Sequence, residues 1–454
     1  MGSEWREVTI DEVATIKHGF AFKGEYFTDV TQPSVLLTPG NFAIGGGFQT
    51  GKPKYYSGPI PTDYVLAEGD LVVTMTDLSK ASDTLGYAAR VPKTTGTTYL
   101  HNQRTGLVQV KDPQVVRAEW LHYLMRTQPY RSWVIGSASG TTVKHTSPSR
   151  IGAYAFKLPP IAEQLSAART LDAVESRIDL LRQTNITLEA IAQALFKSWF
   201  VDFDPVHAKA EGRDPEAMDA ATAALFPSEF EDSELGLIPK GWRARSLDSV
   251  ATYLNGLALQ KFPAESKSEF LPVIKIAQLR AGNTMGSDRA SARLKPEYVV
   301  HDGDVLFSWS GSLEVEFWCG GDGALNQHLF KVTSDEVPKW FYYLATRIHL
   351  PEFRRVAASK ATTMGHIQRK HLAQAKVAVP PPEVLATATK IIAPLLDRRI
   401  TNSLQMRELT QLRDALLPRL ISGKLRLPES VVAAGEALTR TNPSWIEQCD
   451  CGTD

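Results

Sequence analysis

Cysteine is scarce in this sequence, with only three in 454 residues. Cys449 and Cys451 stand one residue apart in a polar C-terminal stretch, and Cys319 is far from both. An odd and sparse set does not build a disulfide framework, and this spacing differs from the Cys-x-x-Cys pairs of zinc and redox sites. We therefore expect neither structural disulfides nor a metal site in this chain.

Long apolar runs are also absent. No stretch approaches the roughly 20 apolar residues that span a bilayer. The first ten residues, MGSEWREVTI, lack the basic and apolar regions of a signal peptide. These two absences predict a cytoplasmic protein without a membrane partner.

An excess of charge of one sign is the third absence, because 50 Lys and Arg residues balance 50 Asp and Glu residues. The overall charge therefore neither favours nor excludes a nucleic-acid partner, and a basic surface would have to be local. The hydrophobic fraction of 43% is ordinary for a globular protein. The length allows roughly two to four folding units.

Catalytic motifs are missing as well. The sequence contains no Asn/Asp-Pro-Pro-Tyr/Phe tetrapeptide of the amino-methyltransferases, no Gly-x-Ser-x-Gly elbow and no His-Glu-x-x-His pair. GGFQTGK (46–52) resembles a phosphate-binding loop, but Pro53 replaces the magnesium-binding hydroxyl and a helix cannot begin there. Asp248 with Glu265 and Lys267 matches the residue set of a magnesium nuclease only loosely. We expect no catalytic residue and no cofactor in this chain.

An imperfect internal repeat is what the sequence does contain. The two halves share landmarks in the same order and at nearly constant separation, as loop insertions in a duplicated unit would produce. The matching pairs are Trp5 and Trp242, Val13-Ala14 and Val250-Ala251, Gly19 and Gly256, 68–72 and 302–306, Asn102-Gln103 and Asn326-Gln327, Trp120 and Trp340, Leu124 and Leu344, Thr141-Thr142 and Thr362-Thr363, His145 and His366, and LPPI (158–161) and VPPP (379–382).

Each half combines strand and helix patterns. DLVVTMT (70–76) and DVLFSWS (304–310) are typical of buried strands, whereas AEWLHYLM (118–125) and KWFYYLAT (339–346) have helical spacing. The predicted fold class is α+β, with two mixed α/β domains, two long antiparallel helices and a pseudo-twofold repeat. The predicted boundaries are 1–160 and 242–382 for the domains, 161–201 and 383–423 for the long helices, 202–241 for a connector and 424–454 for a tail that is expected to be flexible.

The first long helix carries a heptad pattern of apolar residues. Its members are Leu171, Val174, Ile178, Leu181, Asn185, Leu188, Ala192, Leu195 and Trp199. Steps of three and four residues alternate along this seam, as in a coiled coil, and Asn185 is its only polar member. A lone polar residue at such a position often fixes the register of the helix pair. The helix would be roughly 60 Å long.

The second long helix has a noisier pattern. Its apolar positions are Ile392, Leu395, Met406, Leu409, Leu416 and Leu420, and they alternate with Arg399, Asn402 and Arg413. Pro394 is expected to kink or restart this helix. We predict that the two helices pair antiparallel through these seams, which are also expected to contact partner chains. Such a rod would hold two domains about one DNA turn apart, roughly 34 Å, or more.

The candidate DNA contacts are cations, hydroxyls and histidines in loop-like segments. The richest segment is KIAQLRAGNTMGSDRASARLK (275–295), with five cations against Asp288, although an ordinary solvated basic face would have the same composition. GTTVKHTSPSR (140–150) and KATTMGHIQRK (360–370) occupy matching places in the repeat. The candidate residues are Lys52, Lys54, Arg104, Thr141, Thr142, Lys144, His145, Lys275, Arg280, Arg289, Arg293, Lys295, Thr362, Thr363 and His366.

Four segments resemble the specificity subunits of type I restriction-modification systems. They are LPPIAEQ (158–164), ALFKSWFVDFDPVHAKAEGR (194–213), ALFPSEFEDSELGLIPKGW (224–242) and LRDALLPRLISGKL (412–425). The resemblance implies two target recognition domains, each of which reads one half of a split DNA site. It also implies two methyltransferase subunits docked on the helices and two ATP-driven restriction subunits. S-adenosylmethionine, ATP and magnesium would then be bound by these partners.

The differences between the two halves of the sequence support one inference that does not depend on the family resemblance. Two identical readers related by a twofold axis would favour a palindrome, whereas two related but different readers predict an asymmetric, bipartite target. Two alternatives remain open at this point. One is a self-contained restriction or modification enzyme, and the other is a coiled-coil scaffold that does not touch DNA.

Overall fold

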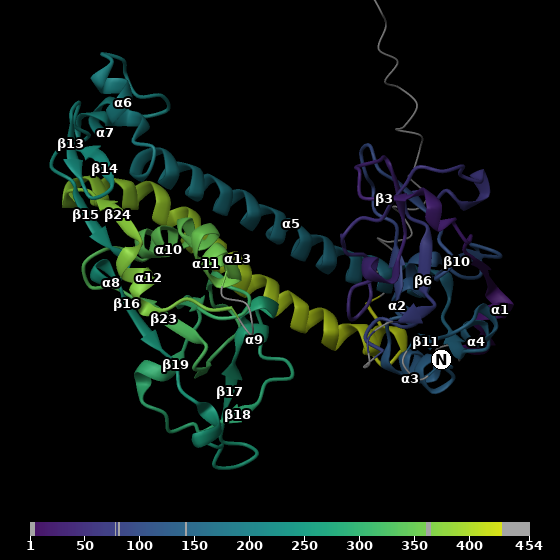
Figure 1. Ribbon diagram of the computed structural model, residues 1–454. Coiled ribbons are helices and arrows are strands. Elements are labelled where there is room, and N and C mark those ends of the chain that lie inside the picture. The colour runs from purple at the N-terminus through teal and green to yellow at the C-terminus, as the bar shows by residue number, and fades with distance from the viewer. Residues whose placement is uncertain (1–4, 78, 80–81, 141–142, 360–364, 429–454) are drawn as a thin grey trace, which may run out of the picture. The chain divides into compact units, whose positions relative to one another are not determined.

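The computed structural model describes residues 5–77, 79, 82–140, 143–359 and 365–428. The chain forms two compact units, of which the first comprises Met1–Ser176 with Thr410–Asp454 and the second comprises Arg177–Leu409 (Figure 1). Two long helices, α5 (Ile161–Phe200) and α13 (Pro382–Ile421), contribute residues to both units.

The first unit contains two four-stranded sheets in the orders β2-β10-β6-β8 and β3-β5-β4-β9, with the strand pairs β1-β12 and β11-β7. Its strands are β1 (Arg6–Thr9), β2 (Ala14–His18), β3 (Phe27–Thr28), β4 (Ser34–Leu36), β5 (Tyr55–Tyr56), β6 (Leu71–Thr74), β7 (Thr76–Asp77), β8 (Ala88–Arg90), β9 (Thr98–Leu100), β10 (Thr105–Val110), β11 (Lys144–His145) and β12 (Ala155–Leu158). Its other helices are α1 (Ile10–Val13), α2 (Ala118–Leu124), α3 (Gln128–Gly136) and α4 (Pro148–Gly152), with 3-10 turns at Gly24–Tyr26, Pro39–Asn41 and Thr62–Tyr64.

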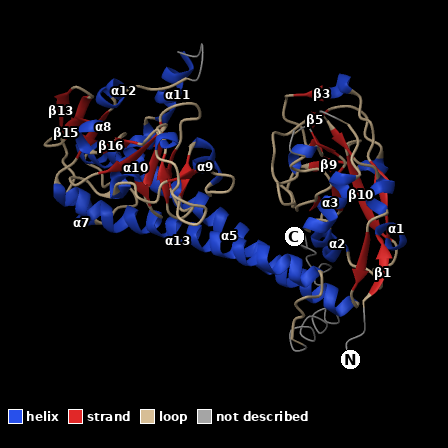
Figure 2. Cartoon of the chain, turned by 90° about the horizontal axis from the view of Figure 1, so that it is seen from below, coloured by secondary structure: helices blue, strands red, loops and turns tan. Residues whose placement is uncertain are grey.

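The second unit has the same kind of architecture, with sheets in the orders β16-β23-β20-β21 and β18-β17-β22-β19 and the pairs β15-β24 and β13-β14 (Figure 2). Its strands are β13 (Phe230–Ser233), β14 (Gly236–Pro239), β15 (Arg243–Ser246), β16 (Thr252–Asn255), β17 (Leu271–Ile274), β18 (Arg289–Ala290), β19 (Val299–Val300), β20 (Val305–Ser308), β21 (Val315–Phe317), β22 (Gly323–Leu325), β23 (Leu329–Thr333) and β24 (Lys376–Val379). Its other helices are α6 (Asp204–Ala210), α7 (Ala220–Ala224), α8 (Leu247–Val250), α9 (Ile276–Ala281), α10 (Lys339–Ile348), α11 (Leu350–Ser359) and α12 (Arg369–Gln374), with 3-10 turns at Leu259–Lys261 and Pro296–Tyr298.

The central strand of each unit explains the continuous apolar runs in the sequence. In β6, Leu71 and Val73 belong to one hydrophobic core and Val72 belongs to another, so both faces of the strand are buried. In β20, Val305 and Leu306 are divided between two cores in the same way. A strand covered on both faces has no polar alternation, because neither face meets water.

The two units share the topology of their central sheet and of one strand pair, which confirms the predicted fold class and its internal repeat. The sheet β2-β10-β6-β8 corresponds strand for strand to β16-β23-β20-β21, and the pair β1-β12 corresponds to β15-β24. The two predicted strand runs contain β6 and β20. The predicted helical run 118–125 contains α2, and the run 339–346 lies within α10. None of the helices within the described ranges is long and apolar enough to cross a membrane.

The repeated glycines are required by a close backbone approach. A Cβ atom on Gly19 would lie 2.0 Å from the carbonyl oxygen of Asn102, and one on Gly256 would lie 2.2 Å from that of Asn326. Both distances are far below van der Waals contact, so any other residue would force the two segments apart. The repeat therefore keeps glycine where two chain segments cross.

The long helices lie antiparallel along their shared seam. In the second unit, Asn185 of α5 bonds to Asn402 and Ser403 of α13, and Glu189, one turn further along α5, pairs with Arg399, one turn back on α13. The helix α13 runs unbroken through Pro394, so the expectation that it restarts there is wrong. Pro394 and Lys390, whose carbonyl loses its partner, are both at exposed positions where water can take over the hydrogen bond.

The heptad seam occupies the covered side of α5. The side chains of Leu171, Ile178, Leu181, Asn185, Ala192 and Trp199 are buried, whereas those of Val174, Leu188 and Leu195 are half-buried. On α13, Ile392 and Leu420 are buried, and Leu395, Met406, Leu409 and Leu416 are half-buried. Leu396, rather than Leu395, is the fully buried leucine beside Pro394.

The polar contact at Asn185 gives a prediction about register. Asn402, which is 1% exposed, donates its amide N–H to the Asn185 Oδ1 atom over 2.9 Å. Asn185→Leu would leave Asn402 without this acceptor, and we expect a loss of about 1–3 kcal/mol in the free energy of unfolding. The double variant Asn185→Leu/Asn402→Leu should recover that loss because no polar group stays unpaired. Denaturant unfolding of the three proteins measures both effects, and equal stability of the single and double variants would contradict the argument.

The connector 202–241 covers the C-terminal end of α5 in the second unit. Phe226 packs edge-on against Trp199 with ring centroids 5.5 Å apart, and it also contacts Trp242 at 6.1 Å. Trp199, Phe226 and Trp242 are all at most 6% exposed. The long aromatic motifs of the sequence in this region therefore form a core and not a ligand site.

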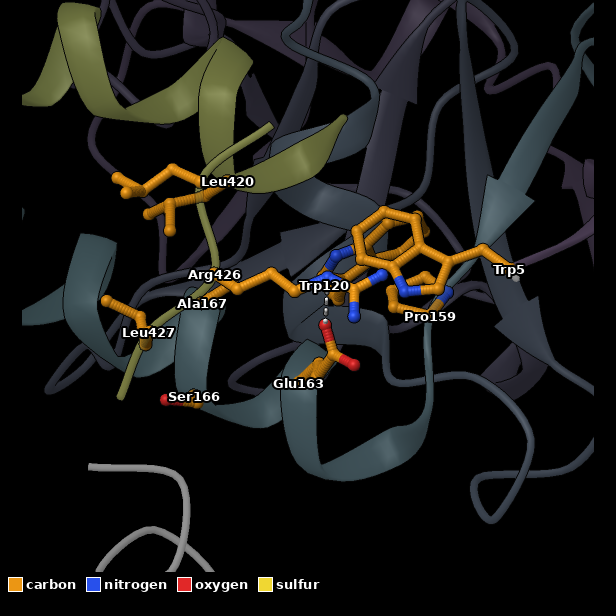
Figure 3. A pocket seen from close by; sticks show the side chains of 10 residues that line it. Trp5, Trp120, Pro159, Glu163, Ser166, Ala167, Leu420, Arg426 and Leu427 are labelled. Atoms are coloured by element: carbon orange, nitrogen blue, oxygen red, sulfur yellow. Dashed lines mark ion pairs between the residues drawn. The ribbon is translucent and has the colours of Figure 1, made fainter. Parts of the chain in front are cut away.

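The first unit contains a small cavity beside the N-terminal end of α5 (Figure 3). Arg426 lies over the ring of Trp5, with 5.8 Å to the centroid, and pairs with Glu163 at 3.9 Å. The cavity has a volume of about 20 Å³ and is also lined by Trp120 and Ser166. This volume suits a single water molecule and excludes a larger ligand.

Candidate nucleic-acid interface

Four segments of the first unit meet at one place, here named junction 1: residues 18–20, 75–77, 102–105 and 144–146. The Gly19 N–H donates to the Thr105 carbonyl, and the Gln103 N–H donates to the Phe20 carbonyl. Met75 connects the other two segments, because its N–H donates to the Arg104 carbonyl and its own carbonyl accepts from the Thr146 N–H. These last two bonds are 2.9 and 3.0 Å long. The ends of β2, β6 and β10 thereby lie beside β11.

Junction 2 in the second unit, residues 255–257, 309–311, 326–329 and 365–367, repeats these hydrogen bonds. Gly256 donates to the Leu329 carbonyl and Gln327 donates to the Leu257 carbonyl. Trp309 takes the place of Met75, since its N–H donates to the His328 carbonyl and its carbonyl accepts from the Ile367 N–H. The two junctions are therefore the same backbone framework.

The two frameworks have the same backbone hydrogen bonds, but only some of their positions carry identical residues. The shared positions are Gly19 and Gly256, Asn102 and Asn326, Gln103 and Gln327, and His145 and His366. Positions that differ include His18 and Asn255, Met75 and Trp309, Arg104 and His328, Lys144 and Gly365, and Thr146 and Ile367. One scaffold thus presents two chemically distinct sets of side chains.

Junction 1 is cationic and open to solvent. Arg104 is exposed and makes no ion pair within the described ranges of the chain, and neither does the half-buried Lys144. His145 is exposed, and its Nδ1 atom lies 3.1 Å from the Thr76 hydroxyl, which orients the ring. Unpaired arginine and lysine donors suit phosphate oxygens and the acceptor-rich edge of guanine.

Junction 2 combines an aromatic wall with amide and imidazole groups. It opens onto a groove of about 400 Å³ that is lined by Asn255, Trp309, Phe330 and residues 366–369. The indole N–H of Trp309 donates to the Asn255 Oδ1 atom over 2.9 Å, and the Ser310 hydroxyl lies 3.0 Å from His328 Nδ1. Amide, imidazole and aromatic groups suit adenine edges and apolar base surfaces better than a purely basic patch would.

His101 borders junction 1 and is buried without charge. Its Nε2 atom lies 3.0 Å from the Thr105 carbonyl, and burial lowers its pKa to about 4. The corresponding residue of the second unit is Leu325, which is also fully buried. The buried residue beside junction 1 can therefore bind a proton at low pH, whereas the corresponding residue beside junction 2 cannot.

The predicted DNA contacts are only partly brought together. Arg104, Lys144 and His145 meet at junction 1, and His366 lies at junction 2. Thr141, Thr142, Thr362 and Thr363 lie outside the described residues. Lys52 and Lys54 belong to the other sheet region, where Lys54 lies 4.0 Å above the ring of Phe27.

The basic segment 275–295 has fewer available cations than its composition indicates. Lys275 pairs with Asp288, and Arg293 lies 3.7 Å from Glu269. Arg289 stacks on Phe270 and donates to the Lys267 carbonyl. Arg280 and Lys295 are the cations of the segment that have neither an ion pair nor a contact with an aromatic ring within the described residues.

Several junction residues were not among the predicted contacts. They are His18, Gln103, Asn255, Trp309, Gln327 and His328, and Arg369 of the adjoining groove was also not predicted. The repeat itself pointed to Asn102-Gln103 and Asn326-Gln327, because a matched polar pair between two strands indicates a shared turn. Trp309 gave no such signal, since its counterpart Met75 is buried and apolar.

Comparison with known families decides what these paired junctions belong to. Residues 2–190 and 239–412 match the family described as "Type I restriction modification DNA specificity domain". The chain belongs to the family of type I restriction-modification DNA specificity subunits. The two matched stretches each contain one junction, and together they cover most of the chain. The resemblance inferred from the sequence motifs is thereby confirmed.

Individual relatives agree with the family. The HindI specificity subunit of Haemophilus influenzae is 26% identical over 363 residues, which cover 68% of this chain and 78% of that protein. The MjaIX specificity subunit of Methanocaldococcus jannaschii is also 26% identical, over 69% of this chain and 70% of its own length. The crystal structure of a type I S subunit from M. genitalium covers 92% of this chain with a TM-score of 0.54 and 15% identity, which supports the shared fold.

Proposed function

We propose that this specificity subunit has no catalytic role of its own and reads an asymmetric, bipartite DNA sequence, with one half-site at each junction. The observation that carries the proposal is the pair of matched frameworks with different side chains. A common backbone places each set of side chains in the same way against DNA, while Arg104 against His328 and Met75 against Trp309 make the base preferences differ.

The helix pair and the partners complete this proposal. The seam helices α5 and α13 would space the two readers, and two methyltransferase and two restriction subunits would assemble on the specificity subunit. S-adenosylmethionine, ATP and magnesium would act on those partner chains. Arg104, Lys144, His145 and His366 are the predicted contacts that the proposal retains at the junctions.

Replacement of Arg104 should change only one half of the recognised sequence. Arg104→Ala removes an exposed cation of junction 1 without touching the framework hydrogen bond, which uses its backbone carbonyl. We expect a loss of about 1–3 kcal/mol, or roughly 5- to 150-fold, in discrimination at one base position. Methylated-base sequencing of cells that contain the methyltransferase partner would show one position of one half-site become degenerate.

A matched control is available in the connector. Arg213 is exposed and pairs with Glu211, outside both junctions, so Arg213→Ala should leave the methylated motif unchanged. A motif that weakens equally in both halves on Arg104→Ala would show that Arg104 contributes only general phosphate attraction. If removal of the whole gene leaves methylation unchanged in cells that contain the methyltransferase partner, the proposed function itself is refuted.

A further inference from the structure

In the second unit, four charged side chains form a closed ring between the long helices and the globular part that carries junction 2. This globular part is here named the second reading domain. Glu189 of α5 forms ion pairs with Arg347 of α10 at 3.0 Å and with Arg399 of α13 at 2.6 Å. Glu316 of β21 pairs with the same two arginines at 2.9 and 2.6 Å. Each arginine therefore bridges both carboxylates, and the ring carries no net charge.

The ring is partly withdrawn from water and rests on aromatic side chains. Exposure of the Glu189 and Arg399 side chains is 11% and 17%. Phe317 and Tyr343 stack beneath it with ring centroids 4.1 Å apart, and the Arg399 guanidinium lies 5.6 Å from the centroid of Phe317. The Tyr343 hydroxyl also donates to Glu189 over 2.7 Å. Charge-assisted bonds in such a setting are directional and poorly screened.

The four members come from four different elements. Arg347 and Glu316 belong to the globular part, and Glu189 and Arg399 belong to the two long helices. The ring is thus a fixed joint between a reading sheet and the helix pair. Loose apolar packing would let the sheet rotate against the helices. Four ion pairs among two guanidinium groups and two carboxylates restrict that angle, and the two pairs that involve Glu316 are also hydrogen bonds.

The first unit has a joint of the same kind built from other residues. Tyr123, the repeat counterpart of Tyr343, donates its hydroxyl to Asp172 of α5 over 2.5 Å. Arg126 of the turn after α2 pairs with Glu175 of α5 at 2.7 Å, and Arg413 of α13 lies 3.7 Å from the same carboxylate. The recurrence of a charged joint, with little identity in its members, argues that the joint has a purpose beyond filling space.

We propose that the ring of Glu189, Arg347, Glu316 and Arg399 sets the angle at which the second reading domain leaves the helix pair, and so restricts the number of base pairs accepted between the two half-sites. This inference rests on the proposed function. It assigns these four residues as positioning residues that touch no DNA and act through the placement of junction 2.

The test measures spacer length separately from half-site sequence. A plasmid library would carry both half-sites with every spacer from several base pairs shorter to several longer than the natural one. The specificity subunit, assembled with its methyltransferase partner, would methylate the library, and sequencing would report the methylated fraction at each length. Glu189→Gln keeps the volume of the side chain and an acceptor for Tyr343 but removes the charge that both arginines share.

We expect the wild-type complex to methylate one spacer length strongly. Glu189→Gln should raise methylation at the neighbouring lengths by at least 10-fold relative to the natural length, with both half-site sequences unchanged. Asp179→Asn is the matched control, because it neutralises an exposed acid on the same helix, paired only with Arg182 in an exposed ion pair. This control should keep the wild-type spacer profile.

A Glu189→Gln complex with a wild-type spacer profile would overturn the inference. If Glu189→Gln methylates nothing, Glu316→Gln decides by the same criterion, and inactivity of both variants would also overturn it, because the ring would then serve folding alone. A wild-type complex that shows no split recognition sequence would instead refute the proposed function. The two failures are therefore distinguishable.

Discussion

Acidification from pH 7.5 to pH 5 is expected to destabilise the first unit well before the second. Two buried histidines of the first unit are uncharged in the fold. Burial is the largest cause that lowers the pKa of His101 to about 4, with smaller contributions from Lys17 and His18, while the hydrogen bond that its ring donates to the Thr105 carbonyl acts in the raising direction. Burial also lowers the pKa of His122 well below its usual value, and Arg126 and Arg90 add to the effect.

The direction of the effect follows from proton linkage. Above its unfolded pKa of about 6.5, a histidine whose pKa is depressed in the fold does not change the free energy of unfolding, because it is neutral in both the folded and the unfolded state. As the pH falls below 6.5, the unfolded chain binds the proton first, so the free energy of unfolding declines until the pH passes the folded pKa. For His101 alone the decline is about 2 kcal/mol at pH 5. His122 adds to it, because burial and the neighbouring Arg126 and Arg90 oppose protonation of its ring.

Hydrogen exchange of the assembled protein at the two pH values, corrected for intrinsic exchange, would measure this loss of protection unit by unit. His101→Leu supplies the residue that the second unit has at the same position, Leu325, and should remove much of the acid sensitivity. Because His101 borders junction 1, recognition of one half-site should fail first on acidification. Equal loss of protection in both units would contradict the argument, although His349 of the second unit, whose pKa burial also lowers, makes a smaller loss there expected.

The sequence predicted the framework of this protein better than its surface. Repeated landmarks such as Gly19 and Gly256 could be recognised because steric contact between crossing segments permits only glycine there. The seam of α5 could be recognised because a helix that packs along its whole length must place apolar residues at heptad spacing. Both features follow from the spacing of residues along the chain, so they can be recognised in the sequence alone.

The candidate contacts depended on long-range pairing that spacing does not reveal. In the segment 275–295, composition alone could not show that Glu269 and Asp288 pair with two of the cations. Trp309 became a candidate only when its hydrogen bonds placed it between His328 and Ile367. The same holds for the ring of Glu189 and Arg399, because Arg399 looked like an interruption of an apolar seam until three other elements were folded against it.

Removal of one arginine from that ring should cost more than any surface substitution. Arg399→Met leaves Glu189 and Glu316 facing each other, with Arg347 as their shared counterion, at a site that is largely withdrawn from water. We expect a loss of about 3–5 kcal/mol in the free energy of unfolding, as is usual when one partner of a buried ion pair is deleted. Asp179→Asn, at an exposed pair, should change it by less than about 1 kcal/mol. Denaturant unfolding of the two variants measures both changes in the free energy of unfolding. Hydrogen exchange in α10 and α13 shows whether the loss lies at the ring.

Replacement of all four charges separates stability from geometry. A variant with methionine at positions 189, 316, 347 and 399 buries no unpaired charge and leaves the Tyr343 hydroxyl without its acceptor, so its stability should return to within about 1–3 kcal/mol of the wild type. Apolar contacts have no preferred direction, however, and this stable variant should still accept several spacer lengths. If it regained both stability and a single spacer length, packing alone would position the reading domain. If it stayed stable but lost spacer selection, the charges would be retained for the angle that they impose.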